Sequence, residues 1–493
     1  MRGTLKIIVR LPERQHNGKR VRKKHSALRT IIINVRPILA LALLPFGCCA
    51  FAAHEYDIAL DESLRSMTVV AHFDRPAHYI AARSRYAGAY LRHAEDCDSG
   101  QPLVVRGRQL ELPADGIRCL SYAVSLSAAE RDTGRIVISP TLWMWRPRLQ
   151  RNDEILATFS LPGTNRVFVP WQMRDASASR YRLVASPESG AATAVFGQFE
   201  ERILPVAGAD VRVVLLGKRD DIELDRFLDW ICRTASNIGM PYGTFPVPQL
   251  SVLLIPVNNW SWGSDRPVTF GRVIRDGGAT VELMINPELP IADYYREWTP
   301  THEFSHLLLP YLDPAQRWIS EGMAQYYQNV LLARAGEYSA ETAWENIQAG
   351  LERGRNSAPG LSPNEASSRG WRNSRMKVYW SGAALALMAD VELRRRSGGR
   401  ESLDTVLAEL GRCCLPSARA WSGVQLFSKL DEFLDAPLFM PLYRQYADAA
   451  AFPDAQPVLA RLGVLYEAGQ VRLDDSAELA ALRAGITRAA MPH

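Results

Sequence analysis

The pattern of hydrophobic and polar positions changes twice along the 493 residues of the chain. Residues 54–205 contain short runs that alternate or are rich in β-branched residues, separated by Gly, Pro, Asp and Ser, as is typical of antiparallel strands. Residues 206–290 combine predicted strands with a helical period over Asp221–Gly239. From Ile291 onward most segments have the helical period. The pattern predicts a sandwich of strands, a mixed α/β part and a helical region.

The mixed part contains four predicted strands. Val211–Leu216 and Leu250–Val257 are largely apolar, which is typical of strands buried inside a sheet. Val268–Ile274 and Thr280–Ile285 flank a turn-forming Asp-Gly-Gly sequence. We therefore expect these last two strands to pair as a hairpin with a longer turn.

The helical region is expected to begin with a helix over Pro300–Leu309, with Thr299 as its cap and Pro300 at the first helical position. Residues 354–374 are rich in Ser, Asn, Gly and Arg and are predicted to form a loop. The last stretch, Leu459–Ile486, is expected to hold a short strand or turn and a final amphipathic helix. Further helices are predicted at Ala315–Ala335, Ala340–Arg353, Tyr379–Arg396, Leu403–Leu410, Phe427–Phe433 and Leu438–Ala451.

The net charge of +5 is distributed unevenly along the chain. Residues 1–53 contain eleven Lys or Arg and a single acidic residue, Glu13, so the remainder of the chain is net acidic. Because the basic residues are concentrated in this leader, the charge does not indicate nucleic-acid binding by the body of the protein.

The leader resembles an export signal. A basic stretch ends at Arg36, and the uncharged, mostly apolar run Pro37–Ala53 follows and ends in small residues. This run is short for a membrane span, which needs about 20 residues. We therefore expect a cleaved signal peptide, a periplasmic or cell-envelope protein and no stable membrane span after cleavage. The alternatives are an uncleaved membrane anchor and a lipoprotein signal at Cys48.

The cysteines suggest one disulfide and no structural zinc site. Cys97 and Cys119 lie 22 residues apart in the strand-rich part, and an oxidising compartment favours a bond between them. The alternative is two unpaired thiols. Cys232, Cys413 and Cys414 receive no assignment, and none of the cysteines has the CxxC spacing of a structural zinc site.

The segment His302-Glu303-Phe304-Ser305-His306 is a candidate metal site. Residues four apart on a helix share one face, so two imidazoles at this spacing can reach one Zn²⁺. Glu303 follows the first histidine, where a carboxylate base can take a proton from a water that zinc has made acidic. These are the only two histidines between positions 94 and 492. Because histidine is so rare in this stretch, two of them in one helical turn favour a metal site over a chance match. The alternative is a pair of ordinary helix histidines.

A catalytic zinc takes three protein ligands and keeps one open position. Glu321, fifteen residues after the second histidine, is the best candidate for the third ligand, and a pair of antiparallel helices would bring it back to the metal. The alternatives are a surface glutamate paired with Arg317, or Asp313 as the ligand. The metzincin class needs Gly and His where this chain has Leu309 and Leu312, and is excluded.

Two further segments carry a resemblance to a known group of enzymes. HEFSH followed by WISEGMAQYY resembles the gluzincins, in particular the aminopeptidase N and glycyl aminopeptidase families, where the second segment runs W-L-x-E-G-F-A-x-Y. The resemblance implies that Glu321 is the third zinc ligand. Val378–Ala383 is similar to the Y-x-K-G segment of these enzymes, which implies that Tyr379 stabilises the tetrahedral intermediate. The resemblance covers roughly residues 206–450.

The implied fold is a multidomain α+β protein. The leader at 1–53 precedes an antiparallel β-sandwich-like domain at 54–205. A thermolysin-like α/β catalytic domain is expected at 206–336, and a helical C-terminal part of the catalytic unit at 337–493.

The implied function is that of an exported zinc metallopeptidase, aminopeptidase-like, that binds one Zn²⁺ and hydrolyses peptide or protein substrates. Glu303 would act as the base and Tyr379 would donate a hydrogen bond to the developing oxyanion. The alternatives are a zinc endopeptidase with the same site and a catalytically silent envelope protein that binds a partner.

The chain departs from the aminopeptidase N pattern at the segment that recognises a free amine. The G-A-M-E-N sequence is absent, and Gly278 and Glu282 of GGATVELMIN are the candidates for binding substrate in its place. The strand around Gly278–Asn286 is the candidate for binding the substrate backbone by strand addition. Glu282 would contact the amine; the alternative is a solvent-facing residue of an alternating strand. Ser381 also replaces the Lys near the tyrosine.

Overall fold

The computed structural model describes residues 52–132, 134–187, 189–216, 223–257, 265–369, 371–467 and 470–488. The predicted leader lies outside the described residues, apart from Ala52 and Ala53, which open the first strand. Across the described part of the chain, every helix is either too short or too polar to cross a lipid bilayer.

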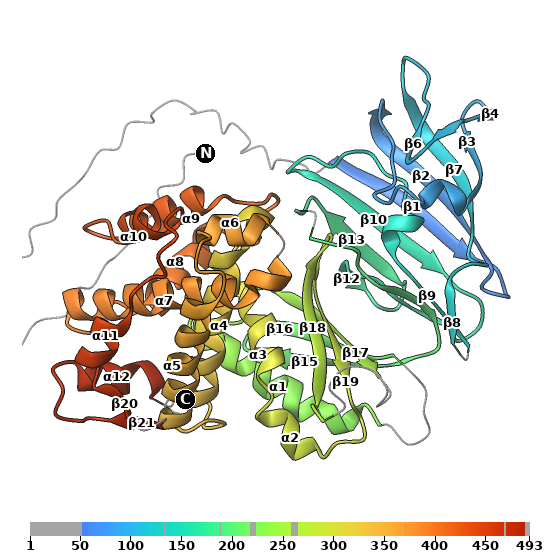
Figure 1. Ribbon diagram of the computed structural model, residues 1–493. Coiled ribbons are helices and arrows are strands. Elements are labelled where there is room, and N and C mark those ends of the chain that lie inside the picture. The colour runs from blue at the N-terminus through green and yellow to red at the C-terminus, as the bar shows by residue number, and fades with distance from the viewer. Residues whose placement is uncertain are drawn as a thin grey trace, which may run out of the picture. The chain divides into compact units, whose positions relative to one another are not determined.

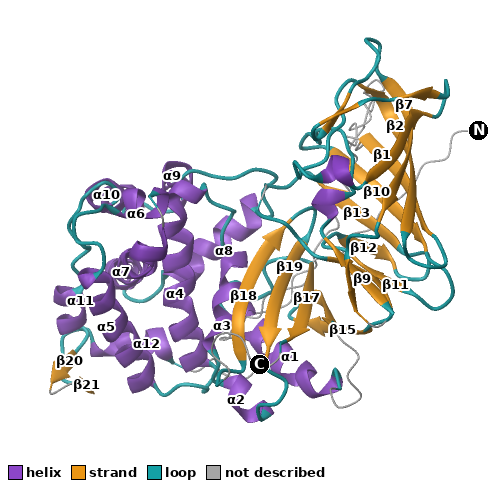
Figure 2. Ribbon diagram, turned by 45° about the vertical axis from the view of Figure 1, so that its right-hand side comes forward, coloured by secondary structure: helices purple, strands orange, loops and turns teal. Residues whose placement is uncertain are grey.

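The first part of the chain forms two large β-sheets that enclose an aromatic core (Figures 1 and 2), together with a small two-stranded sheet of β5 (Val105–Arg106) and β6 (Gln109–Leu110). The strand orders are β12-β13-β10-β1-β2-β7-β3-β4 and β11-β14-β9-β8, and the pairs are antiparallel except for the parallel pair β1–β10. The larger sheet consists of β1 (Ala52–Leu60), β2 (Ser66–Ala77), β3 (Leu91–Asp96), β4 (Gln101–Pro102), β7 (Ile117–Ser125), β10 (Asp153–Ser160), β12 (Gln172–Asp175) and β13 (Arg180–Val184). The smaller sheet consists of β8 (Glu130–Asp132), β9 (Arg135–Ile138), β11 (Arg166–Phe168) and β14 (Ala194–Gly197).

A five-stranded mixed sheet follows, in the order β15-β16-β17-β19-β18. Its strands are β15 (Glu200–Val206), β16 (Ala209–Leu215), β17 (Gln249–Pro256), β18 (Val268–Arg275) and β19 (Ala279–Ile285). The predicted hairpin is confirmed as β18 and β19, which pair antiparallel, whereas β16, β17 and β19 run parallel. The central strands β16 and β17 are largely buried on both faces of the sheet, and their alternate residues point to opposite sides. Val213 packs into the helical core and Val214 packs against the β-rich part.

The remainder of the chain is helical and covers one face of the mixed sheet (Figure 2). The helices are α1 (Asp225–Gly239), α2 (Ile291–Tyr295), α3 (Trp298–Ser305), α4 (Arg317–Arg334), α5 (Ala340–Asn356), α6 (Pro363–Ser368), α7 (Trp371–Ser397), α8 (Leu403–Cys414), α9 (Gly423–Asp431), α10 (Phe439–Tyr446), α11 (Gln456–Arg461) and α12 (Ala480–Thr487). A short hairpin, β20 (Val464–Glu467) and β21 (Gln470–Leu473), precedes α12. The expected α+β architecture, with a β-rich part before a mixed sheet and helices, is therefore confirmed.

Two local expectations are wrong. Residues 354–374 contain helix α6 and the start of α7 rather than a continuous loop. Ser362 begins α6 with a capping box, in which its hydroxyl accepts from the Glu365 N–H and the Glu365 carboxylate accepts from the Ser362 N–H. Helix α3, which carries the candidate histidines and is called the metal helix below, is capped by Glu297 rather than by Thr299. The Glu297 carboxylate accepts a hydrogen bond from the N–H of Thr299.

The cysteine pairing is confirmed and extended. Cys97, which follows β3, bonds to Cys119 in β7. The neighbours Cys413 and Cys414 form a second disulfide at the end of α8, which the sequence left unassigned. Cys232 is a thiol that packs partly buried against the helical core.

Helices α4 and α7 touch backbone to backbone through two glycines. A Cβ atom added to Gly322 would come 2.2 Å from the Cα of Gly382, and one added to Gly382 would come 2.1 Å from the carbonyl oxygen of Trp318. Gly322 directly follows Glu321, and Gly382 lies three residues after Tyr379. The contact therefore fixes the distance between the helix that bears the candidate third ligand and the helix that bears the candidate tyrosine.

Replacing Gly322 by Ala is expected to lower the free energy of unfolding by about 2 kcal/mol, because the backbones must move apart to admit the methyl group. Urea unfolding of the purified protein measures the change. The matched control is Gly485→Ala in helix α12, where the nearest atom to the added Cβ lies at 3.9 Å. We expect that control to be neutral or slightly stabilising, because Ala favours a helix over Gly by up to about 1 kcal/mol. Equal midpoints for Gly322→Ala and the wild type would contradict the tight contact.

Candidate metal centre

The two histidines stand at the C-terminal end of the short helix α3. His302 is buried within the helix, and His306 follows its last residue and begins a 3-10 turn. The guanidinium of Arg275, at the end of β18, donates a hydrogen bond to the carbonyl oxygen of His306. A cation at this position stabilises the carbonyl groups that a helix leaves without partners at its C-terminus. The sheet thus fixes the end of the metal helix through Arg275.

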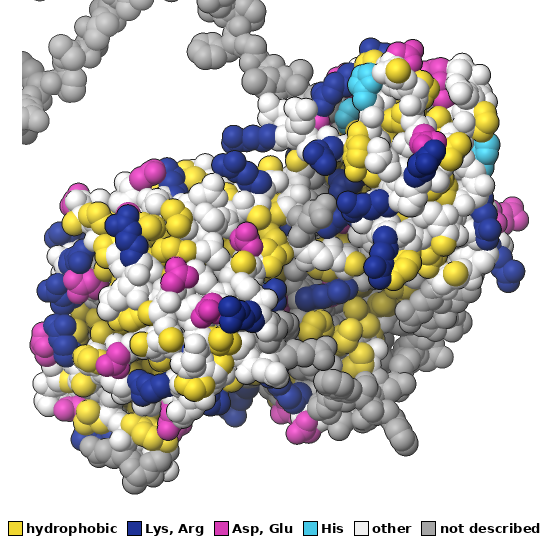
Figure 3. All heavy atoms as spheres, turned by 45° about the horizontal axis from the view of Figure 1, so that its top comes forward, with side chains coloured by type: hydrophobic (Ala, Val, Ile, Leu, Met, Phe, Trp, Pro, Cys, Tyr) yellow, Lys and Arg dark blue, Asp and Glu magenta, His cyan; other side chains and the backbone are white. Residues whose placement is uncertain are grey.

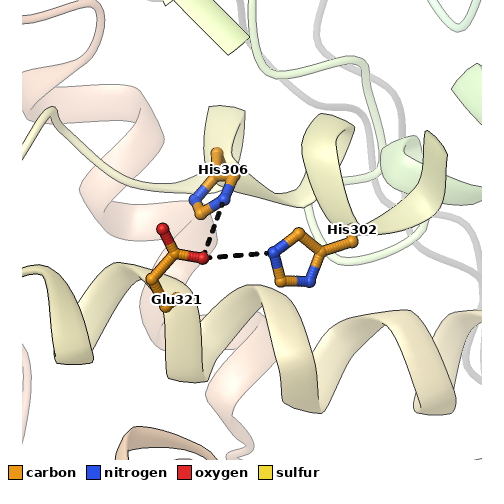
Figure 4. A group of neighbouring side chains, drawn as sticks. All are labelled: His302, His306 and Glu321. Atoms are coloured by element: carbon orange, nitrogen blue, oxygen red, sulfur yellow. Dashed lines mark hydrogen bonds and ion pairs between the residues drawn. The ribbon is translucent and has the colours of Figure 1, made fainter. Parts of the chain in front are cut away.

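Helix α4 brings Glu321 to the two histidines, as the sequence predicts (Figure 4). Both rings point at the same carboxylate oxygen: Oε2 lies 3.3 Å from His302 Nε2 and 3.7 Å from His306 Nε2. The ligand atoms of the three residues all lie within 4.8 Å of one another. Asp313, the alternative ligand, instead accepts a hydrogen bond from the backbone N–H of Ala315 at the start of a 3-10 turn.

These distances fit a zinc ion. Nitrogen and oxygen ligands bind zinc at about 2.0–2.2 Å in a tetrahedral arrangement, so two ligand atoms on one ion stand roughly 3.4 Å apart. The separations of 3.3 Å and 3.7 Å bracket this value. Two imidazoles and one carboxylate are also a donor set that leaves the fourth position of a catalytic zinc open.

Gln328 holds His302 in the required orientation. Its Oε1 accepts a hydrogen bond from His302 Nδ1 at 2.9 Å, which leaves Nε2 to face Glu321. Gln328 lies two turns after Glu321 on α4 and is buried. Gln328 is not among the site residues predicted from the sequence, although a spacing of seven residues on one helix places its side chain and that of Glu321 on the same face.

The charges of the cluster suit metal binding at neutral pH. Burial lowers the pKa of His306 to about 4, so this ring is neutral and can offer a lone pair. Burial opposes the ionisation of Glu321, but the hydrogen bond with His302 and the nearby histidine charges hold its pKa below the ordinary value. His302 has a raised pKa because its contacts with Glu321 and Glu303 outweigh its burial. Of the three candidate ligands, only His302 has a pKa shifted toward its protonated form, so a dication would have to displace a proton from His302 alone.

Glu303 lies between the cluster and the edge strand of the mixed sheet. A Cβ atom on Gly271 of β18 would come within 2.7 Å of Glu303 Cγ, so the glycine leaves room for this side chain. The backbone N–H of Val273 on the same strand donates to the carboxylate, and burial nevertheless raises the pKa of Glu303 to about 7. A carboxylate with a pKa near the working pH is well matched to proton transfer.

Tyr379 projects from helix α7 onto the same cluster. Its ring lies 5.7 Å from the ring of His302, in an edge-on arrangement. Burial and the charges of Glu321 and Glu303 raise its pKa well above the ordinary value, so the phenol keeps its proton. Tyr379 lies two turns inside α7, whereas the sequence placed it at a helix start. The sequence-predicted residues His302, Glu303, His306, Glu321 and Tyr379 therefore lie together.

Known proteins share a segment of this chain and its fold. The family model of the M61 glycyl aminopeptidases matches residues 312–385, a segment that includes Glu321 and Tyr379. An aminopeptidase N family protein from Idiomarina loihiensis superimposes with a TM-score of 0.62 at 15% identity, over 84% of this chain and 78% of that one. A two-domain M1 zinc metallopeptidase mutant bound to L-arginine superimposes with a TM-score of 0.51 at 15% identity, over 82% and 95%. A search of curated proteins gives no match.

The fold is that of the aminopeptidase N family. The resemblance to the gluzincins inferred from the sequence is thereby confirmed. The three candidate ligands, Glu303 and Tyr379 are described from here on as the gluzincin-like centre.

The residues predicted to bind substrate are not arranged as expected. Glu282 is 3% exposed, so the solvent-facing alternative is wrong. Its carboxylate pairs with Arg272 at 2.5 Å and accepts the backbone N–H of Thr193 at 3.1 Å, contacts that an amine would have to displace. Gly278 packs against the carbonyl oxygen of Pro170, where an added Cβ would come within 2.4 Å. Both residues connect the mixed sheet to the β-rich part.

The strand predicted to accept the substrate backbone is also wrong. β19 is hydrogen-bonded to β17 on one side and to β18 on the other, so its backbone groups are already paired. Among the described residues the edge strands of this sheet are β15 and β18, and Gly271 places β18 beside Glu303. Sequence periodicity identifies strands but does not order them within a sheet, which explains this error.

Replacing Gln328 by Ala is expected to weaken zinc binding by about 10–100-fold, because His302 loses the acceptor that sets its orientation. Competition with a fluorescent zinc chelator measures the dissociation constant. The matched control is Gln425→Ala at the start of helix α9, a residue whose hydrogen bonds are to Ser422. Equal zinc affinity for Gln328→Ala and the control would contradict the role of Gln328.

Proposed function

We propose that this protein is an exported zinc-dependent peptidase, aminopeptidase-like in fold, that hydrolyses peptide bonds. The observation that carries the proposal is the His302, His306 and Glu321 cluster, whose spacing fits one Zn²⁺, with Glu303 beside it. The fold of the aminopeptidase N family supports the same class of reaction. Export rests on the leader at 1–53 and agrees with the disulfide between Cys97 and Cys119.

The side chains divide the steps of hydrolysis between them. Bound zinc would supply a Lewis acid that lowers the pKa of water and polarises the scissile carbonyl. Glu303, with its pKa near 7, accepts the proton of the attacking water and returns it to the leaving amine. Tyr379 keeps its proton and donates a hydrogen bond to the oxyanion, a contact worth about 10²–10³ in rate.

The edge strand β18 offers a place for the peptide. An extended chain that pairs with an exposed strand gains main-chain hydrogen bonds independently of its sequence. Gly271 on β18 borders Glu303, so a peptide on this edge would pass the base. Gly278 and Glu282 have no part in this arrangement.

The experiment that tests the function uses the purified mature protein and a library of peptides, each prepared with a free and with an acetylated N-terminus. We expect metal analysis to give one zinc per chain. We also expect a chelator to abolish hydrolysis and added zinc to restore it. Chelator-resistant hydrolysis, or zinc without hydrolysis of any peptide, would refute the proposal. Zinc without hydrolysis is the outcome that a silent binding protein would give.

A zinc endopeptidase is the second candidate function, and one observation favours it. The acid proposed to bind the substrate amine, Glu282, is paired with Arg272. An aminopeptidase would cleave only the peptides with a free N-terminus. Equal cleavage of the acetylated peptides would identify the endopeptidase.

A further inference from the structure

We propose that the gluzincin-like centre selects substrates that carry a carboxylate close to the scissile bond, and that Arg317 and Arg375 are the principal residues that recognise it. This inference rests on the proposed peptidase function and names the substrate class for the same site. The carboxylate is either an acidic side chain or the C-terminus of a short peptide.

Helix geometry places both arginines one turn from residues of the centre. Arg317 lies four residues before Glu321 on α4, and Arg375 lies four residues before Tyr379 on α7. Side chains at this spacing are neighbours on the same helix face. Arg375 is exposed and Arg317 is partly exposed, so both guanidinium groups can reach a solvated ligand.

Arg275 touches the centre from the sheet, and two arginines of the β-rich part contact the residue that follows it. Arg275 contacts the carbonyl oxygen of His306. Arg83 and Arg146 both face the buried carboxylate of Asp276, at 2.8 Å and 3.6 Å. Asp276 directly follows Arg275, so these two arginines lie close to it in the structure.

The charges of several of these arginines act on two tyrosines near the metal helix. The charges of Arg375 and Arg317 both act to lower the pKa of Tyr379, and those of Arg317, Arg275 and Arg83 act in the same direction on Tyr311, although burial keeps both pKa values raised. Tyr311 lies six residues after the last residue of the metal helix. Arginines from α4, β18 and the β-rich part therefore act near the C-terminal end of that helix.

Among the described residues, Glu303, Glu321 and Asp313 are the negative charges that act on the two tyrosines. The negative charges of Glu303 and Glu321 raise the pKa of Tyr379, and the two positive charges of a bound dication would offset these two negative charges. Asp313 acts on Tyr311 but caps the 3-10 turn before α4. Figure 3 shows Lys and Arg side chains gathered along the border between the helices and the β-rich part on the face drawn. A substrate carboxylate would pair with Arg317 or Arg375 on this side of the centre.

A carboxylate is therefore a better ligand here than a protonated amine. An ammonium group would face the same arginines and be repelled, and the acid expected to receive it, Glu282, is paired elsewhere. Guanidinium groups bind carboxylates with charge-assisted hydrogen bonds, often two at a time. The arginines thus give a physical reason for a substrate preference that the family resemblance does not contain.

The test compares peptides that differ by one charge. One pair carries Glu or Gln next to the scissile bond with an amidated C-terminus, and the other pair has neutral side chains and a free or amidated C-terminus. We expect kcat/KM to be about tenfold higher for the charged member of at least one pair, and the pair that responds identifies the source of the carboxylate. Since exposed charges are screened by salt, 1 M NaCl should bring that ratio close to one.

The variant Arg375→Gln should lower this ratio about threefold, since an exposed ion pair contributes up to about fivefold. The matched control is Arg396→Gln, at the other end of helix α7 and roughly 30 Å away, which removes the same charge and should leave the ratio unchanged. Circular dichroism confirms that both variants are folded. Equal effects of the two variants would overturn the proposal, since they would report only the total charge.

A binding measurement separates this inference from the proposed function. Calorimetric titration of the Glu303→Gln variant with the same peptide pairs reports affinity without hydrolysis. A preference for the charged peptide that Arg375→Gln reduces supports the inference even where no peptide is cleaved. Hydrolysis and binding with ratios of one for both pairs would overturn the inference and leave the peptidase function standing.

Discussion

Replacing Glu303 by Gln is expected to lower kcat by about 10²–10⁴-fold and to leave the zinc content unchanged. The amide has the shape of the carboxylate, so it fits the space that Gly271 leaves beside it, but it has no basic oxygen to accept the proton of the attacking water. Glu303 is outside the group of three residues whose donor atoms fit the ion, so zinc binding should persist. Metal analysis and steady-state kinetics on one preparation measure both properties.

The control for this change is Glu352→Gln, an exposed residue of helix α5, which should keep full activity. The pH dependence of the wild type gives a second check. Burial raises the pKa of Glu303 to about 7, and the base must be ionised, so kcat/KM falls as the pH falls through this pKa. A bound dication lowers the pKa of a neighbouring carboxylate, so the acidic limb is expected below pH 7. Full activity of Glu303→Gln would refute the mechanism.

Replacing Glu321 by Ala is expected to weaken zinc binding by more than the roughly 100-fold limit seen when a supporting partner is removed. The carboxylate oxygen lies 3.3 Å and 3.7 Å from the two imidazole nitrogens, so its loss removes one corner of the site. Hydrolysis should disappear together with the metal. Equilibrium dialysis against zinc, followed by metal analysis, gives the dissociation constant.

Two companion variants make the Glu321 result interpretable. Glu321→Gln keeps the volume of the side chain, so zinc loss in that variant reports the missing charge rather than a cavity. Glu345→Gln, on helix α5, is the matched control and should retain zinc. If Glu321→Ala and Glu321→Gln both bind zinc as tightly as the wild type, Glu321 is not a ligand and the gluzincin-like centre is incorrect.

The sequence predicts the chemistry of the centre better than its surroundings. His302 and His306 share a helix turn, and the W-x-x-E-G segment points to Glu321, so these residues follow from local spacing and resemblance. The structure brings them within 4.8 Å. The contact of Gln328 with His302 joins residues 26 positions apart on different helices. The spacing of seven residues from Glu321 places Gln328 on the same face of α4, but this local pattern does not identify its partner.

The errors in the fold also have physical causes. The stretch Ser362-Pro363-Asn364-Glu365 carries the capping-box spacing that starts a helix, but its loop-like composition outweighed that signal. Glu282 was expected at a solvent-facing or substrate-facing edge, because period two identifies a strand without its neighbours. The observed order puts β19 inside the sheet, where the Arg272 side chain and the Thr193 N–H take up the charge.

The contact between Gly322 and Gly382 has a consequence for how such a chain can change over generations. In most packed cores a larger residue at one position can be accommodated by a smaller one opposite, but both partners here are already the smallest residue. A larger residue at either position therefore cannot be accommodated by a smaller residue at the other. We expect mutational drift to be blocked at these two glycines and open at exposed positions such as Arg375. Substrate preference can then diverge among descendants while the spacing of metal ligand and tyrosine is inherited unchanged.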